Sequence, residues 1–125
     1  MSKPADSVWQ QAFANTPNGY LKWIKASLAD TVRLIMVEEV QFFQSDGKYT
    51  RVVTQTEEAL IRLSLKNLLE QLDPSQFAQI HRSTIVNLHA IESIRKIDGA
   101  TEIRLKGRKE ILAVSEAYSR QFRQM

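Results

Sequence analysis

The side chains best suited to bind phosphates and base edges lie in short basic clusters along the chain. His81, Arg82 and Ser83 are consecutive and come just before an apolar pair, Ile85-Val86. Arg, Lys, Ser and Thr are the side chains that commonly contact the phosphates and groove edges of nucleic acids. Two similar clusters lie at other expected turns, Lys48 with Arg51 and Lys106 with Arg108 and Lys109, and Arg120 and Arg123 lie on the expected last helix. Their repeated position at turns and element ends favours binding of a polyanion such as a nucleic acid.

The residues that catalysis needs are scarce in this chain. It has two histidines, His81 and His89, and no cysteine. His89 and Glu92 have a spacing found in helical metal sites, but no third ligand is evident. Ser83 lacks the strained elbow and the orienting carboxylate of a serine nucleophile. The four glycines form no phosphate-binding loop. The sequence therefore predicts a protein that is not an enzyme and that holds no metal or cofactor.

Length and charge point to a single domain with an anionic partner. A chain of 125 residues is the size of one domain. Residues 81–125 carry nine Lys and Arg against five Asp and Glu, a net charge of +4, whereas residues 1–80 have a net charge of −1. No apolar run approaches the length of a membrane span, and no signal peptide is evident. These features, with the absence of cysteine, predict a cytoplasmic protein whose basic half meets a polyanion.

Short segments with period two predict a mainly β fold. In residues 20–27 the alternation places Leu21 and Trp23 on the buried side, with Ile24 a less regular candidate. The pairs Asp46-Gly47 and Asp98-Gly99 each lie between strand-like runs, which is typical of hairpins.

Helices are expected only in the middle of the chain and near its ends. Leu65, Leu68, Leu69 and Leu72 have helical spacing after a cap at Ser64. A terminal helix is expected over residues 116–125. Residues 1–19 contain "DSVWQQAF", which also has helical spacing. This leader is interpreted either as a short helix that covers a hydrophobic patch or as a linker or dimer helix joined to another domain.

These residues and their spacing resemble the LytTR DNA-binding domain family; the resemblance runs from about Tyr20 to Phe122, and it assigns residues 20–125 to such a domain. The densest match is F-x-x-I-H-R-S-x-I-V-N, from Phe77 to Asn87, with "FFQSDGKYTRVVT" before it and "RLKGRKEILAVSEAY" after it. The resemblance implies an elongated, mainly β domain whose loops enter the grooves of double-stranded DNA. It also implies the output domain of a bacterial two-component response regulator that recognises paired direct repeats with two copies. Whether a receiver domain is joined to this chain in a longer protein stays open.

The resemblance also implies which residues touch DNA. In the first loop it assigns Thr50 to a base edge and Lys48 and Arg51 to phosphates. The matching loop around Arg82 implies a groove contact for Arg82 and a phosphate contact for Ser83, with His81 either orienting the loop or contacting the DNA backbone.

The third loop departs from the family pattern. The family commonly has an arginine directly after the serine that corresponds to Ser115, and this chain has Glu116. The third contact is then absent, altered, or supplied by Arg120 one helical turn later.

Asn87 is expected to cap the turn that follows it. Two other functions stay open from the residues alone: a protein-interaction module whose basic loops bind an acidic partner, and sequence-tolerant RNA binding.

Overall fold

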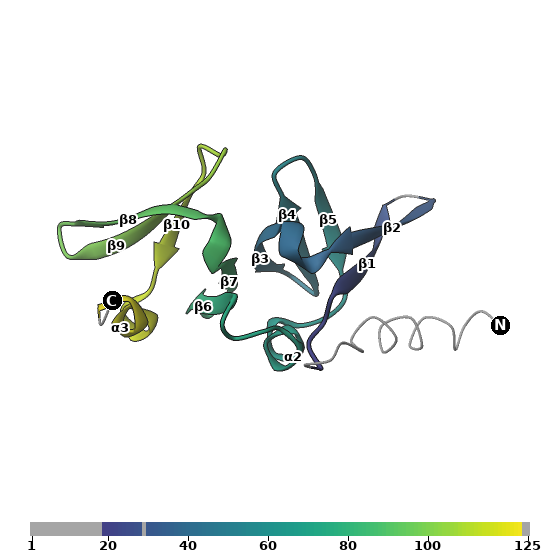
Figure 1. Cartoon of the computed structure of the whole chain (residues 1–125), viewed down its shortest axis with the longest axis horizontal. Helices are drawn as coiled ribbons and strands as arrows, with labels where there is room; N and C mark the ends of the chain where they lie inside the picture. The colour runs from purple at the N-terminus through teal and green to yellow at the C-terminus, as the bar shows by residue number, and fades with distance from the viewer. Residues whose placement is uncertain (1–18, 29, 124–125) are drawn as a thin grey trace.

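Two antiparallel sheets make up most of the domain. The computed structural model describes residues 19–28 and 30–123, and the predictions for residues 1–18 lie outside this part of the chain. The first sheet has the strand order β2-β1-β5-β4-β3-β7-β6 and the second the order β10-β9-β8. The strands are β1 Trp23–Leu28, β2 Thr31–Met36, β3 Val40–Asp46, β4 Tyr49–Thr54, β5 Glu58–Ile61, β6 Phe77–His81, β7 Thr84–Asn87, β8 Ile91–Ile97, β9 Ala100–Leu105 and β10 Ile111–Val114. Figure 1 shows an elongated molecule with the second sheet at one end. The expected mainly β fold is confirmed.

Both Asp-Gly hairpins form where the sequence predicts them. Asp46 pairs with Tyr49 across the β3–β4 turn, and Gly47 has a φ of 65°. At the β8–β9 turn both central residues have positive φ, 52° at Asp98 and 83° at Gly99. Such backbone angles match the right-handed twist of paired strands, and glycine and aspartate tolerate them. The turns thereby set the register of the strands on either side.

The middle helix also begins as expected. Helix α2 spans Leu65–Gln71, and the Ser64 hydroxyl accepts a hydrogen bond of 3.1 Å from the backbone N–H of Asn67. Such a cap satisfies one of the N–H groups that a helix start leaves without a partner. After the helix, the backbone N–H and hydroxyl of Ser75 donate to the Asp73 carboxylate and lower its pKa. The chain then turns directly into β6.

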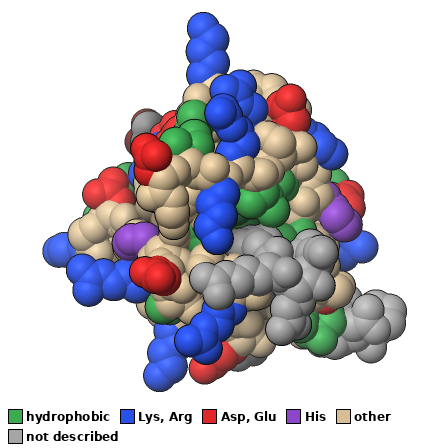
Figure 2. Space-filling model, turned by 90° about the vertical axis from the view of Figure 1, so that its left-hand side faces the viewer, with side chains coloured by type: hydrophobic (Ala, Val, Ile, Leu, Met, Phe, Trp, Pro, Cys, Tyr) green, Lys and Arg blue, Asp and Glu red, His purple; other side chains and the backbone are tan. Residues whose placement is uncertain are grey.

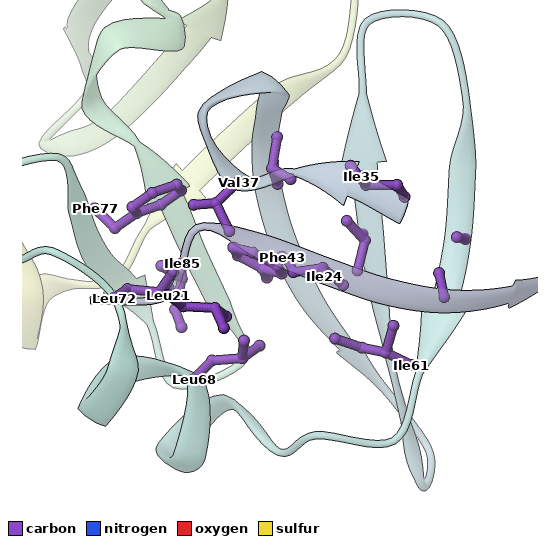
Figure 3. Close-up of a cluster of buried hydrophobic side chains, with 14 of the residues drawn as sticks. Leu21, Ile24, Ile35, Val37, Phe43, Ile61, Leu68, Leu72, Phe77 and Ile85 are labelled. Atoms are coloured by element: carbon purple, nitrogen blue, oxygen red, sulfur yellow. The ribbon is translucent and has the colours of Figure 1, made fainter. Parts of the chain in front are cut away.

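The central strands bury both of their faces. On one side, Phe43, Val52 and Ile85 belong to a core that also contains the helix side chain Leu68 (Figure 3). On the other side, the neighbouring residues Phe42, Val53 and Val86 belong to a second core that includes Ile103, Leu105 and Leu112 of the second sheet. The sheet is therefore held from both sides, with β3, β4 and β7 in the middle of the domain.

One strand differs in its register from the expectation. Leu21 is buried as predicted, but it precedes β1, and the buried positions on β1 itself are Ile24 and Ala26. Trp23 is only half-buried and lies on the opposite face of β1. Because the side-chain period of a strand is two, this shift of one residue exchanges the two faces.

The remaining elements are short helices. Two 3-10 turns, Val37–Glu39 and Leu88–Ala90, lead into β3 and β8 respectively. The expected C-terminal helix is present as α3, Glu116–Arg123. Its Tyr118 packs against the second core, which fixes the start of α3 beside β6.

Candidate nucleic-acid interface

The β3–β4 turn presents one of the predicted cations to solvent. Lys48 is exposed at the tip of this turn, next to half-buried Tyr49. Arg62, which directly follows β5, lies with its guanidinium carbon 5.9 Å from the centre of the Tyr49 ring. Arg62 is exposed and was not among the predicted site residues. Arg62 comes next to the β3–β4 turn because Ile61, the residue before it, pairs with Thr50 of β4. The sequence alone does not show this pairing.

The Thr50 side chain, which was expected to approach a base edge, lies inside the domain. Its side chain is only 2% exposed, and its hydroxyl donates a hydrogen bond of 2.7 Å to the carbonyl oxygen of Leu63. Thr50 lies on the inner face of β4, the side that carries Val52. It therefore holds the chain between β5 and α2 in place and does not reach outward.

Arg51, expected to contact a phosphate, is half-buried and already has partners within the domain. Its guanidinium donates to Oε1 of Gln44 at 2.6 Å and lies 3.1 Å from the Glu58 carboxylate. The same group stands 5.9 Å from the centre of the Phe42 ring. Arg51 thus connects three neighbouring strands, and a phosphate would have to compete with Glu58 for it.

The β6–β7 turn holds the His-Arg-Ser motif in a fixed shape. His81 pairs with Thr84, so Arg82 and Ser83 form the tip of the turn, and Arg82 is exposed there. The Ser83 backbone N–H donates to Nδ1 of His81 at 3.2 Å, and the Ser83 hydroxyl oxygen lies 2.9 Å from the same nitrogen. Because the backbone N–H can only donate, Nδ1 of His81 is the acceptor of this hydrogen bond. His81 therefore orders the turn.

The base of this turn is anchored as the sequence predicts. Ile85 and Val86 are completely buried, one in each core. The Asn87 side chain accepts from the backbone N–H of His89 at 2.9 Å and donates to the carbonyl oxygen of Val40 at 2.8 Å. The expected capping role of Asn87 is confirmed, and the same side chain also links β7 to the start of β3.

The third predicted contact lies at the start of α3. Glu116 is the first residue of this helix and Arg120 lies one turn later, and both are exposed. Glu116 also borders a hollow of about 330 Å³ with Lys96 and Asp98 of the β8–β9 hairpin. A carboxylate fits the first turn of a helix, where backbone N–H groups point outward.

Strand pairing brings these three segments to one edge of the domain. The backbone N–H of Ser45, at the end of β3, donates to the Ser83 carbonyl at 2.9 Å, which joins the first two turns. The N–H of Ser115 donates to the carbonyl of Ile80 at 2.9 Å, which places the start of α3 beside the His-Arg-Ser turn. We call this edge the turn edge; its exposed polar residues are Lys48, Arg62, Arg82, Glu116 and Arg120.

One basic cluster lies elsewhere. The turn around Gly107 packs on the opposite end of β4, where Arg108 donates to the carbonyl of Thr54 at 3.1 Å. Arg108 also lies 3.2 Å from Glu110. Strand β4 is six residues long, so its ends, Tyr49 and Thr54, lie roughly 17 Å apart at the usual rise per residue. The predicted basic clusters are therefore divided between the two ends of β4.

Lys and Arg side chains also stand out from the end of the molecule formed by the second sheet and α3, with fewer acidic side chains between them (Figure 2). Within residues 19–28 and 30–123, no three His, Asp or Glu side chains are grouped to hold a metal ion. No helix in the described part of the chain is long and apolar enough to cross a membrane.

Known proteins of similar sequence are regulators. An uncharacterized response regulatory protein of Vibrio cholerae serotype O1 is 38% identical over 94 residues, which cover 72% of this chain and 36% of that protein. The CO-responsive transcriptional regulator RcoM of Rhodospirillum rubrum is 36% identical over 80 residues, covering 64% of this chain and 34% of the relative. The chain thus spans about a third of the length of these relatives.

The fold and the family model agree with each other. A solved LytTr DNA-binding domain of a putative methyl-accepting/DNA response regulator from Bacillus cereus superposes with a TM-score of 0.76. That match covers 82% of this chain and 94% of the solved chain at 22% identity, and it shows the shared fold. The family model of the LytTr DNA-binding domain matches residues 30–125. This chain therefore belongs to the LytTR DNA-binding domain family.

Proposed function

We propose that the chain binds double-stranded DNA in a sequence-specific way through the turn edge, as the output domain of a bacterial transcriptional regulator. The observation that carries this proposal is that three separate segments, each with exposed cations, meet at one edge. Turns that project from a single edge can reach neighbouring grooves and the phosphates between them. Phosphate contacts then give affinity and register, whereas contacts to base edges give sequence preference.

Each exposed residue has a role that fits its position. Arg82, at the tip of the His-Arg-Ser turn, reads a base edge, and its guanidinium can make two hydrogen bonds to one guanine. Lys48, Arg62 and Arg120 contact phosphates, and Ser83 adds a hydroxyl contact. Buried Ile85 and Val86 hold the turn still, so that little conformational entropy is lost when the complex forms.

The proposal extends to the way in which copies assemble on DNA. Two copies bind paired direct repeats at a promoter, each through its own turn edge, and no dimer in free solution is required. The chain acts in the bacterial cytoplasm, and in a longer protein a receiver domain would control it. The relatives are described as response regulatory and transcriptional regulator proteins, which supports this assignment.

Selection of binders from a random pool of DNA duplexes tests the function directly. The native protein and Arg82→Ala are run side by side at near-physiological salt concentration, since affinity without a stated salt concentration cannot be interpreted. We expect the native protein to enrich a repeated motif and Arg82→Ala to lose or blur it. Enrichment of no motif would refute sequence-specific DNA binding and would favour a module whose basic loops bind an acidic protein.

A further inference from the structure

The guanidinium of Arg62 lies over the ring of Tyr49 because strand pairing makes the two residues neighbours. Thr50 of β4 pairs with Ile61 of β5, and both of these side chains are buried. One residue further out, Tyr49 and Arg62 therefore point to the opposite face of the sheet and come side by side. The guanidinium carbon is 5.9 Å from the centre of the ring, within the range of a cation–π contact.

Two other arginines of the domain approach an aromatic ring, and they differ from Arg62 in their charge partners. The guanidinium carbons of Arg51 and Arg108 lie 5.9 Å and 6.0 Å from the centre of the Phe42 ring. Each guanidinium also has a carboxylate oxygen close by, at 3.1 Å and 3.2 Å respectively, and the two side chains are 23% and 20% exposed. Both are therefore already paired with carboxylates of the domain.

Arg62 keeps its charge available. It is exposed, and within residues 19–28 and 30–123 no acidic side chain forms an ion pair with it. A cation–π contact neutralises no charge, and a guanidinium has five N–H donors. The Tyr49 ring therefore holds Arg62 beside the β3–β4 turn and leaves it able to bind an anion.

We propose that Tyr49 is a positioning residue for DNA binding, whose ring holds Arg62 so that the guanidinium donates two hydrogen bonds to one phosphate. This inference rests on the proposed function and assigns to Tyr49 a part in it. Arginine can bond to two oxygens of a phosphate at once, whereas a lysine ammonium acts as a point charge. A long side chain loses rotamer freedom when it binds, and one that is already ordered loses less. Tyr49 thus raises affinity without touching DNA.

The place of the pair along the turn edge fits this role. Strands β4 and β3 lie between β5 and β7, so the end of β5 is three strand spacings, roughly 14 Å, from β7 and its turn. The major groove of DNA is about 12 Å wide. With Arg82 in such a groove, Arg62 therefore lies near the phosphates that border it and not over the base edges inside it.

Fluorescence anisotropy with the duplex enriched from the random pool tests the pair. Tyr49→Leu removes the ring face and should weaken binding roughly 3-fold to 10-fold, the cost of ordering one long side chain. Tyr49→Phe keeps the ring face and should bind as the native protein does. In the Arg62→Ala background, Tyr49→Leu should cause no further loss, because the side chain that it positions is gone. Arg62→Lys keeps the charge but not the two-bond contact, and should also bind more weakly than the native protein.

NMR of the free protein tests the positioning without DNA. Protons over a ring face resonate upfield, so the side-chain signals of Arg62 should be shifted upfield in the native protein and in Tyr49→Phe. Tyr49→Leu should return them to the position of an ordinary exposed arginine. Urea unfolding of each variant establishes that the proteins compared are folded.

Three results would overturn the inference. Tyr49→Leu could bind like the native protein. Its loss could persist in full when residue 62 is alanine, which would make Tyr49 a support of the turn alone. Arg62→Ala could bind like the native protein, which would place Arg62 outside the interface. Failure of the native protein to bind the duplex would instead refute the proposed function, and the NMR comparison would still decide whether Tyr49 holds Arg62.

Discussion

Arg82 and Thr50 belong to two neighbouring turns, but their side chains have opposite surroundings. Arg82 is exposed at the tip of the β6–β7 turn, whereas the Thr50 hydroxyl is buried and donates to the Leu63 carbonyl. The Thr50 hydroxyl would have to leave the protein interior and give up this hydrogen bond before it could contact a base. Arg82 is thus placed to reach a ligand outside the domain, whereas Thr50 supports the turn edge from inside.

Arg82→Ala should weaken binding to the selected site and reduce discrimination at one base pair. Loss of a two-bond contact to a base costs about 1–3 kcal/mol, roughly 5-fold to 150-fold in affinity. Fluorescence anisotropy with the selected duplex and single-base variants measures both effects. Arg104→Ala is the matched control, because Arg104 is an exposed arginine on β9, outside the turn edge. Equal losses for the two variants would show that Arg82 contributes only charge.

Thr50→Val should destabilise the fold and leave base preference unchanged. Valine has nearly the same shape but leaves the Leu63 carbonyl without its partner, which costs about 1–3 kcal/mol. Urea unfolding measures the loss, and binding is then compared under conditions where both proteins are fully folded. An altered base preference in the folded variant would restore the base-edge role that the resemblance implies.

Glu116→Arg should tighten DNA binding and change the preferred base at one position. A carboxylate at the turn edge repels phosphates, whereas an arginine there can bond to a guanine edge with about 1–3 kcal/mol of discrimination. The control is Glu92→Arg, the same change of charge at an exposed position on β8. If affinity and site preference both stay as in the native protein, Glu116 lies outside the interface.

At the scale of elements, the Asp-Gly hairpins, the Ser64 cap and the Asn87 cap could be predicted because each depends on a few adjacent residues. The outward or inward direction of Thr50 and Arg51 could not be predicted, because it depends on how β4 pairs with β3 and β5. Arg62 was missed for the same reason: only the pairing of Thr50 with Ile61 brings it to the turn edge. The positions of the turns thus follow from a few adjacent residues, whereas the side chains that each turn exposes depend on pairing between strands that are distant in the sequence.

The Asn87 side chain at the end of β7 makes a contribution to the stability of the fold that can be tested directly. Asn87 is 2% exposed, and its amide joins β7, the start of β3 and the turn before β8. Asn87→Ala should lower the free energy of unfolding by about 1–3 kcal/mol, because it leaves buried backbone groups without partners. Asn67→Ala, at an exposed position of α2, is the control and should change little. Equal midpoints for Asn87→Ala and the native protein in urea would contradict this role.

At the scale of the whole molecule, the central strands β3, β4 and β7 are buried on both faces. The two hairpin turns that these strands carry are therefore held in fixed positions at the turn edge. The basic groups are nevertheless divided, because the Gly107 turn packs against the far end of β4. The sequence shows that the second half of the chain is basic, but it does not show that these cations lie at both ends of β4. Composition alone therefore overstates how many cations one DNA surface can use.

Salt dependence measures how many of those cations contact phosphates. The logarithm of affinity falls linearly with the logarithm of salt concentration, and each phosphate contact adds about 0.9 to the slope. Lys48→Ala, at the turn edge, should reduce the slope by about one for each bound copy and weaken all duplexes alike. Lys109→Ala removes the same charge from an exposed position at the Gly107 turn and should leave the slope unchanged. A titration over several salt concentrations compares them. An equal reduction for Lys109→Ala would place DNA at both ends of β4, which a single turn edge cannot explain.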